Sequence, residues 1–212
     1  MEANIISIAV GEGKEYKKGT ETFKSAYKKD KFLSSVKVTK LGLDGDFQID
    51  KRYHGGEDKA IHICSSKFFD LYKELYGKEI DKYSFGSNLF IDTYDEKDIC
   101  VGDIYTIGEV EVEVTQPRQP CWKIGVIFDK EVSRFISKYS ATGWYVRVLK
   151  EGTINIDDKM VLKKRVSELN IKELTHYLHN TLDDKEKTDY ILELKPLAQA
   201  YKNDFKITQK IS

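Results

Sequence analysis

Proline, cysteine and long apolar runs are scarce in this chain of 212 residues. It contains three prolines and three cysteines, and no stretch approaches the roughly 20 apolar residues that a membrane-spanning helix needs. An odd number of widely spaced cysteines does not suggest a disulfide framework, and the N-terminal stretch lacks the basic start of a signal peptide. We therefore expect a protein of the reducing cytoplasm, without a membrane segment.

The chain also lacks an excess of charge of either sign. Lysine plus arginine and aspartate plus glutamate both number 35, so the formal net charge is zero. Domains that bind nucleic acid usually carry a basic excess, so we do not expect a nucleic-acid partner. Hydrophobic residues make up 40% of the chain, which is enough for the packed core of one domain with a small appendage.

Residues 1–162 show the pattern of a β-rich domain. Val110, Val112 and Val114 alternate with glutamates after a turn at Gly108, and similar short apolar runs recur along this part of the chain. Two stretches, at 66–77 and 130–143, instead carry apolar residues at helical spacing. The fold class predicted is mixed α/β but β-rich, a β-barrel or closed sheet with inserted helices.

Residues 163–212 have a different character. Glycine is absent there, Pro196 is the only proline, and apolar residues recur at helical spacing. Asn170 and Thr175 are alternative candidates for the N-cap of the first of these helices, and Glu173, three residues after Asn170, is a candidate capping-box partner. This part predicts a C-terminal helical subdomain of two or three short helices.

The stretch VTQPRQPCWKI, residues 114–124, holds two of the three prolines around Cys121. Proline stiffens the backbone, and the cations Arg118 and Lys123 would stabilise a thiolate, which is both a nucleophile and a metal ligand. A buried structural cysteine is the alternative. Cys64 and Cys100 lie in apolar segments, and we expect both in the core.

A second polar segment, residues 41–63, is rich in glycine and charge. The pair Gly55 and Gly56 would let backbone N–H groups approach a ligand, and Arg52 and His54 are candidate phosphate contacts. A solvated polar hairpin is the alternative, and a nucleophilic pair of Cys121 with His54 is a further one. In FGSNLF, residues 85–90, the amide of Asn88 could bind a ligand or cap a neighbour.

Taken in order, five motifs resemble the MOSC domain, the family named for the C-terminal domain of molybdenum-cofactor sulfurases. They are GLDGDFQIDKRYHGGEDKAI, FGSNL, VGDIY, VTQPRQPCWKI and GWYVRVL, within residues 41–149. The resemblance is closest to the stand-alone bacterial YiiM-like branch, whose small three-helix domain the C-terminal segment also resembles. Ser87 stands where the family commonly has glutamate, and the shifted His62 receives no role.

The resemblance implies a MOSC-type β-barrel that binds the molybdenum cofactor (molybdopterin). Cys121 would be the catalytic residue and the thiolate ligand of molybdenum. The residues expected to hold the cofactor are Arg52, His54, Gly55, Gly56, Asn88, Arg118, Lys123 and Arg147.

The implied activity is that of an oxidoreductase that reduces N-hydroxylated compounds, such as N-hydroxylated bases, to amines. A flavoprotein reductase would supply the electrons. Two alternatives stay open: a sulfur carrier with a persulfide on Cys121, and a non-catalytic module that binds an anion such as phosphate. The sequence also leaves open whether the chain is a monomer or a homodimer.

Overall fold

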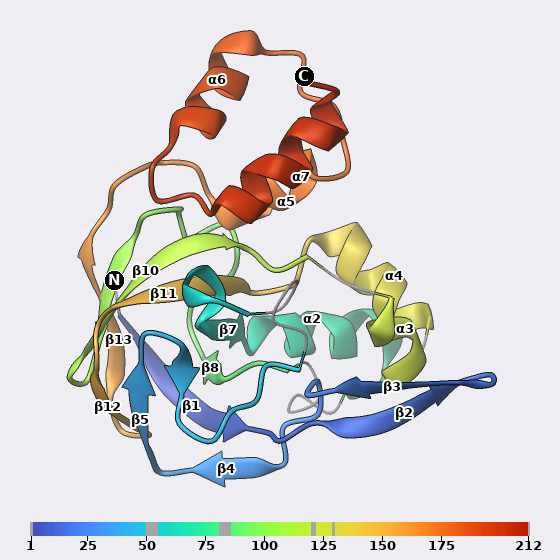
Figure 1. Cartoon of the computed structure of the whole chain (residues 1–212), viewed down its shortest axis with the longest axis vertical. Helices are drawn as coiled ribbons and strands as arrows, with labels where there is room; N and C mark the ends of the chain where they lie inside the picture. Colours follow the sequence, from blue (N-terminus) through green and yellow to red (C-terminus); the bar gives the residue numbers. More distant parts are fainter. Residues whose placement is uncertain (1, 50–54, 81–85, 120–121, 129, 212) are drawn as a thin grey trace.

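A closed β-barrel forms the body of the molecule (Figure 1). The computed structural model describes residues 2–49, 55–80, 86–119, 122–128 and 130–211. In these residues seven strands follow one another in the order β13-β9-β10-β11-β7-β8-β1, and pairing of β1 with β13 closes the ring. The strands are β1 (Glu2–Val10), β7 (Ile61–Ser65), β8 (Leu89–Ile91), β9 (Ile104–Ile107), β10 (Val110–Pro117), β11 (Trp144–Lys150) and β13 (Lys159–Lys164). The predicted β-rich, barrel-like fold with inserted helices is confirmed.

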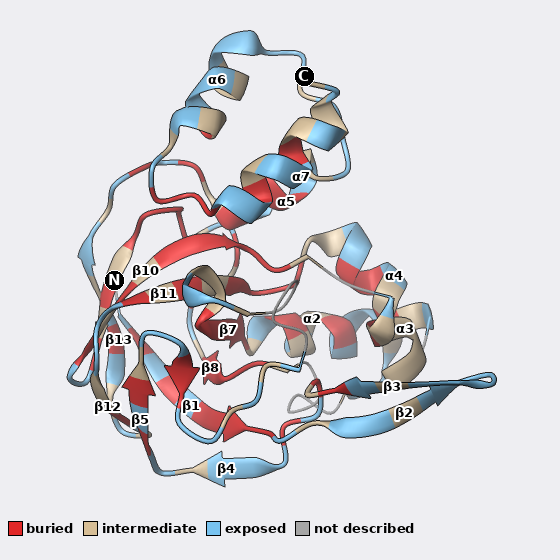
Figure 2. Cartoon of the chain, viewed as in Figure 1, coloured by how far each residue is buried: buried red, intermediate tan, exposed pale blue. Residues whose placement is uncertain are grey.

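Strand β10 shows how the sequence pattern builds this barrel. Val110, Val112 and Val114 are fully buried, whereas Glu111 and Glu113 between them are partly exposed. The strand pairs with β9 through the turn at Gly108 and with β11 on its other side. Strand β7 joins β8 in parallel, which brings His62 and Asn88 into neighbouring positions. Figure 2 shows the resulting core as buried colour running along the barrel strands.

Smaller sheets surround the barrel. They are the trio β5 (Ser35–Thr39), β6 (Gly42–Leu43) and β12 (Gly152–Asn155), and the hairpin β2 (Lys14–Lys18) with β3 (Glu21–Ser25). Strand β4 (Lys31–Leu33) pairs with β1 as an eighth strand of the barrel sheet. The hairpin projects from the barrel in Figure 1.

Helices cover one side of the barrel. They are the 3₁₀ turn η1 (Glu57–Lys59), α2 (Lys67–Tyr76), α3 (Lys123–Ile127) and α4 (Lys130–Tyr139). Helix α2 ends at Gly77, whose φ of 64° is the left-handed conformation that glycine adopts without strain. The apolar stripes of α2 and α4 meet through Phe68, Tyr72 and Phe135, so both helices predicted from apolar periodicity are present.

Three C-terminal helices pack at one end of the barrel: α5 (Ile171–Tyr177), α6 (Lys185–Glu193) and α7 (Gln199–Gln209) (Figure 1). The predicted cap is present, because the side-chain oxygen of Asn170 accepts a hydrogen bond from the backbone N–H of Glu173 at 2.9 Å. Strand β13 ends at Lys164, two residues beyond the predicted barrel boundary at residue 162. No helix within the described ranges is long and apolar enough to cross a membrane.

Candidate functional site

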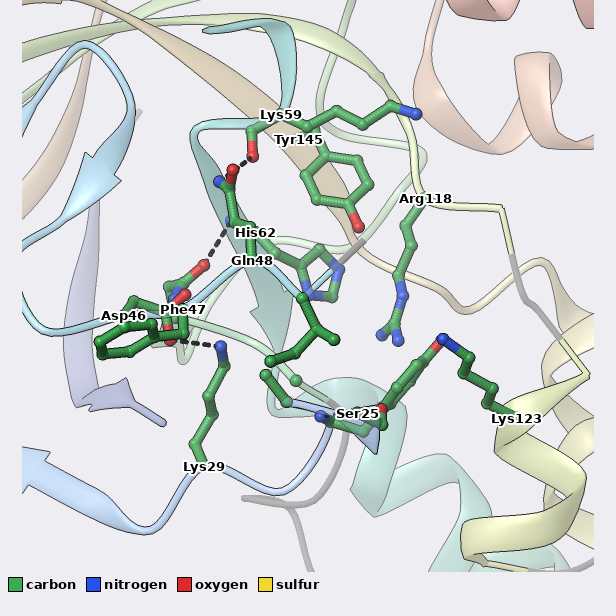
Figure 3. Close-up of a pocket in the computed structure, with 15 residues that line it drawn as sticks. Ser25, Lys29, Asp46, Phe47, Gln48, Lys59, His62, Arg118, Lys123 and Tyr145 are labelled. Carbon is green, nitrogen blue, oxygen red and sulfur yellow. Dashed lines mark hydrogen bonds and ion pairs between the residues drawn. The ribbon is translucent and has the colours of Figure 1, made fainter. Parts of the chain in front are cut away.

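A pocket opens where several loops converge at the barrel (Figure 3). Its lining comes from the end of β3 and the loop after it, from the loop before η1 and the last residue of η1, from the segments before β8 and after β10, and from β7, β11 and the start of α3. The lining residues are Ser25, Ala26, Tyr27, Lys29, Asp46, Phe47, Gln48, Ile49, Lys59, His62, Gly86, Asn88, Arg118, Lys123 and Tyr145.

A buried ion pair forms one wall of the pocket. Lys29 Nζ lies 2.5 Å from Asp46 Oδ1, and the two side chains are only 5% and 9% exposed. The backbone N–H of Gly11 also donates to Asp46 Oδ1, at 3.0 Å. Burial lowers the pKa of Lys29, and the adjacent Asp46 carboxylate opposes this effect. The pair therefore ties the 26–29 segment to the loop that begins at Asp46.

Asn88 connects this ion pair to the barrel strands. Its Nδ2 donates to Asp46 Oδ2 at 2.9 Å and to the carbonyl of Ala9 at 3.4 Å. Its Oδ1 accepts the backbone N–H of His62 at 3.0 Å. Asn88 lines the pocket, and these three bonds engage both ends of its amide within the protein.

His62 is buried and projects from β7 into the pocket wall (Figure 3). Its Nε2 lies 3.0 Å from the carbonyl oxygen of Thr142. A carbonyl can only accept, so this contact is a hydrogen bond in the tautomer with the proton on Nε2. Burial and the nearby Arg118 cation lower the pKa of His62 well below its usual value, and Lys29 adds to this. The imidazole is therefore neutral at physiological pH.

The opposite side of the pocket is cationic. The guanidinium carbon of Arg118 lies 4.6 Å from the centre of the Tyr27 ring, and Figure 3 shows the head groups of Arg118 and Lys123 turned toward one region. Burial lowers the pKa of Lys59, which lies at the end of η1. Among the described lining residues, four side chains are lysine or arginine and one is a carboxylate, so the pocket suits an anionic ligand.

The chain segment that contains Cys121 is anchored on both sides. Before it, Gln119 Nε2 donates to Asp204 of α7 at 2.9 Å. After it, the ring of Trp122 packs edge-on against Phe23 of the β2–β3 hairpin, with ring centres 4.8 Å apart. Cys121 itself lies outside the described residues, and so do Arg52 and His54.

The other two cysteines are core residues, as predicted. Cys64 is 2% and Cys100 is 3% exposed. Burial raises the pKa of the Cys64 thiol to about 12 and that of the Cys100 thiol to about 11. Both remain protonated at neutral pH and are poorly suited to act as thiolates.

The structure brings together three of the predicted site residues and places others elsewhere. Asn88, Arg118 and Lys123 line the same pocket. Gly55 and Gly56 immediately precede η1, and the Gly56 N–H donates to the pocket residue Gln48 at 3.4 Å. The two glycines are therefore beside the pocket rather than in its described lining.

Arg147 does not line the pocket. Its guanidinium forms ion pairs with Asp58 at 2.8 Å and Glu113 at 3.3 Å, and donates to the carbonyl of Pro196 at 2.9 Å. These contacts join β11 to η1, β10 and the C-terminal subdomain. In this geometry the Arg147 guanidinium is engaged by protein groups, and its expected contact with a cofactor stays a prediction.

Sequence reasoning missed Lys29, Asp46 and His62. Asp46 lies in the polar 41–63 segment, where several charged residues looked equivalent. The alternation of residues 60–64 placed His62 on a strand, but periodicity does not show which face meets a pocket. Lys29 lies in the charged run KSAYKKDK, and nothing in that run distinguishes the one lysine that becomes buried.

The family model described as "MOSC domain" matches residues 50–161, more than half of the chain. The chain belongs to the MOSC domain family. This match spans β7 to the middle of β13 and so includes most of the barrel. MOSC domains are associated with binding of the molybdenum cofactor.

Individual relatives agree with this assignment. The chain is 29% identical to the uncharacterized protein YflK of Bacillus subtilis, over 76% of this chain and 74% of that protein. It is 28% identical to protein YiiM of Escherichia coli, over 79% of this chain and 75% of that protein. A protein named "Reductase" from Gibberella moniliformis is 29% identical over 76% of this chain, but only 29% of that longer protein is covered.

The whole fold is shared with a solved crystal structure. The crystal structure of YiiM from Geobacillus stearothermophilus superimposes with a TM-score of 0.80 at 30% sequence identity. The superposition covers 98% of this chain and 99% of that one, so the C-terminal helices are part of the similarity as well as the barrel.

Proposed function

We propose that this protein is a molybdenum-cofactor-dependent oxidoreductase that reduces N-hydroxylated compounds to amines. The observation that carries the proposal is the position of Arg118 and Lys123. They stand three residues before and two residues after Cys121, and both line the cationic pocket. Their positions support a site in which the Cys121 thiolate is presented to a ligand held there.

The donor set of the pocket fits this cofactor. The phosphate group of the cofactor is an anion, and lysine and arginine side chains are the usual protein partners of phosphate. Lys29, Lys59, Arg118 and Lys123 supply such groups, although Lys29 is also paired with Asp46. A thiolate is a soft ligand that suits a molybdenum already bound by sulfur, so Cys121 is our candidate for the protein ligand.

The overall reaction is R–NH–OH plus two electrons and two protons, giving R–NH2 plus water. The cofactor, when bound, supplies the oxygen-transfer and redox chemistry. A flavoprotein reductase is the proposed electron donor. His62 is neutral and serves to shape the wall and to orient the ligand.

Metal and pterin analysis of the purified protein tests the proposal. The full chain is produced in a host that makes the cofactor, as wild type, Cys121→Ala and the matched control Cys64→Ala. We expect near-stoichiometric molybdenum and pterin in wild type and control, and loss of both in Cys121→Ala. With a chemical reductant as electron donor, turnover of an N-hydroxylated base should be retained in wild type and Cys64→Ala and lost in Cys121→Ala.

Other outcomes would favour the alternatives. Cyanide-labile sulfur on Cys121 in a protein that never acquires molybdenum would support a sulfur carrier. Unchanged binding of a phosphorylated ligand after Cys121→Ser, again without molybdenum, would support a non-catalytic anion-binding module. Either result would overturn the reductase proposal.

A further inference from the structure

We propose that Glu96 is a positioning residue for the pocket, a buried carboxyl that holds His62 and Arg118 in place and links them to the C-terminal helical subdomain. Glu96 lies in the loop between β8 and β9 and is 7% exposed. It does not line the pocket, so it would act through the backbone of the 142–143 segment.

Two hydrogen bonds fix Glu96 on opposite sides. Its carboxylate Oε1 accepts the backbone N–H of Gly143 at 2.8 Å. Its own backbone carbonyl accepts the N–H of Lys172, in the first turn of α5, at 3.0 Å. One residue thus connects the loop before β11 with the first helix of the C-terminal subdomain.

The 142–143 segment connects Glu96 to the two pocket residues His62 and Arg118. The carbonyl of Gly143 accepts the backbone N–H of Arg118 at 3.1 Å, and the preceding carbonyl, that of Thr142, accepts the His62 ring proton. Gly143 has φ of 72°, and a Cβ there would lie 2.8 Å from His62 Nε2 and 2.3 Å from the carbonyl of Ile63. The backbone at Gly143 therefore packs directly against His62 and Ile63, at a distance that only glycine permits.

The energetics favour a positioning role over simple packing. A buried carboxyl has a large desolvation cost, which an apolar side chain of similar size would avoid. Burial raises the pKa of Glu96 to about 7, with a smaller contribution from Asp95. The Glu96 carboxyl also helps to raise the pKa of the buried Cys64 thiol. The Glu96 carboxyl offsets this desolvation cost by giving the Gly143 N–H a fixed hydrogen-bond acceptor.

The inference depends on the proposed function only in taking this pocket as the reaction site. Its test is therefore made on the full chain from a host that cannot make the cofactor. The first readout is the ¹⁵N NMR spectrum of the imidazoles, which shows the His62 tautomer. The second is the affinity for inorganic phosphate, used as the probe of the cationic side that includes Arg118.

Glu96→Ala removes the acceptor, and Glu96→Gln keeps an oxygen that can accept the same N–H. We expect Glu96→Ala to lose the single Nε2–H tautomer of His62 and to weaken phosphate binding about fivefold or more. Glu96→Gln should restore both. If the alanine variant does not fold, Glu96→Leu fills the space without an acceptor and is expected to give the same loss.

Asp103→Ala is the matched control. Asp103 is also a buried carboxylate, but it pairs with Arg165, outside the described pocket lining. We expect this variant to lose stability and to keep the His62 spectrum and the phosphate affinity of the wild type. The proposal is overturned if Glu96→Ala leaves both readouts unchanged, or if Asp103→Ala alters them as much as Glu96→Ala does.

Discussion

The pocket and the C-terminal subdomain use their interiors differently. Around the pocket, the buried groups include the ion pair of Lys29 with Asp46 and the side chains of His62, Glu96 and Arg118. In the subdomain, the fully buried side chains are mainly apolar or aromatic: Ile171, Leu174, Ile191, Tyr201 and Phe205. Figure 2 shows the subdomain helices buried only along the faces that meet each other or the barrel.

This contrast indicates where the fold accepts a cost in stability. Charged groups in a protein interior stabilise the fold less than well-packed apolar groups of the same volume. The barrel provides a rigid frame in which such groups are held by defined hydrogen bonds, as Asp46 is by Gly11 and Asn88. We infer that the polar interior is retained for the chemistry of the pocket, whereas the subdomain is optimised for packing.

The largest expected effect comes from breaking the buried ion pair. Asp46→Ala leaves Lys29 with a buried charge and removes the acceptor of the Gly11 N–H, so we expect a loss of about 3–5 kcal/mol in the free energy of unfolding. Urea denaturation measures this loss. The double variant Lys29→Met, Asp46→Leu should recover much of the loss, because no charge is left without a partner. A double variant as unstable as Asp46→Ala would contradict this account.

The corresponding change in the subdomain is Phe205→Ala. Phe205 is fully buried and stacks with Tyr201, so the cavity should cost about 3–4 kcal/mol. We expect phosphate affinity of the folded protein to change less than twofold, since Phe205 is not among the described residues that line the pocket. A loss of phosphate affinity well beyond twofold in Phe205→Ala would remove the distinction between the two regions.

The third prediction concerns pH. The pKa of Glu96 in the folded protein is about 7, above the ordinary value of 4.5, so between these values the folded state holds a proton that the unfolded state has lost. Stability should therefore fall as pH rises from 4.5 to 7, by up to about 3 kcal/mol from this group. Glu96→Gln should abolish that part of the pH dependence in urea denaturation at a series of pH values. An unchanged profile would show that Glu96 ionises normally.

Local patterns predicted much of the fold. The alternation at Val110, Val112 and Val114, the helical stripe of α2 with its Gly77 cap, and the Asn170 cap all depend on neighbours in sequence, and all are present. The site was only partly predictable, because its wall joins residues 9, 29, 46, 62 and 88 through long-range contacts. Arg147 showed the converse: it lies within a family motif, yet its charge is used in ion pairs with Asp58 and Glu113.

The smallest expected effect on stability concerns the two helices of the subdomain that have side-chain N-caps. It tests whether contact with the barrel keeps a helix ordered when its cap is removed. Asn170 caps α5, and Asp184 caps α6 through the N–H of Lys187 at 2.9 Å. Replacing either by alanine should cost about 1 kcal/mol, the usual value of an N-cap. The start of α5 is also held by the backbone bond of Ile171 to Ile99 on the barrel side.

Hydrogen exchange should therefore separate the two variants more clearly than stability does. In Asn170→Ala, the first turn of α5 should remain protected because the barrel still holds its backbone. In Asp184→Ala, the first turn of α6 has no such support and its amide protection should fall. Equal loss of protection in both helices would mean that the contact with the barrel does not order α5, and would weaken the route by which Glu96 links the subdomain to the pocket.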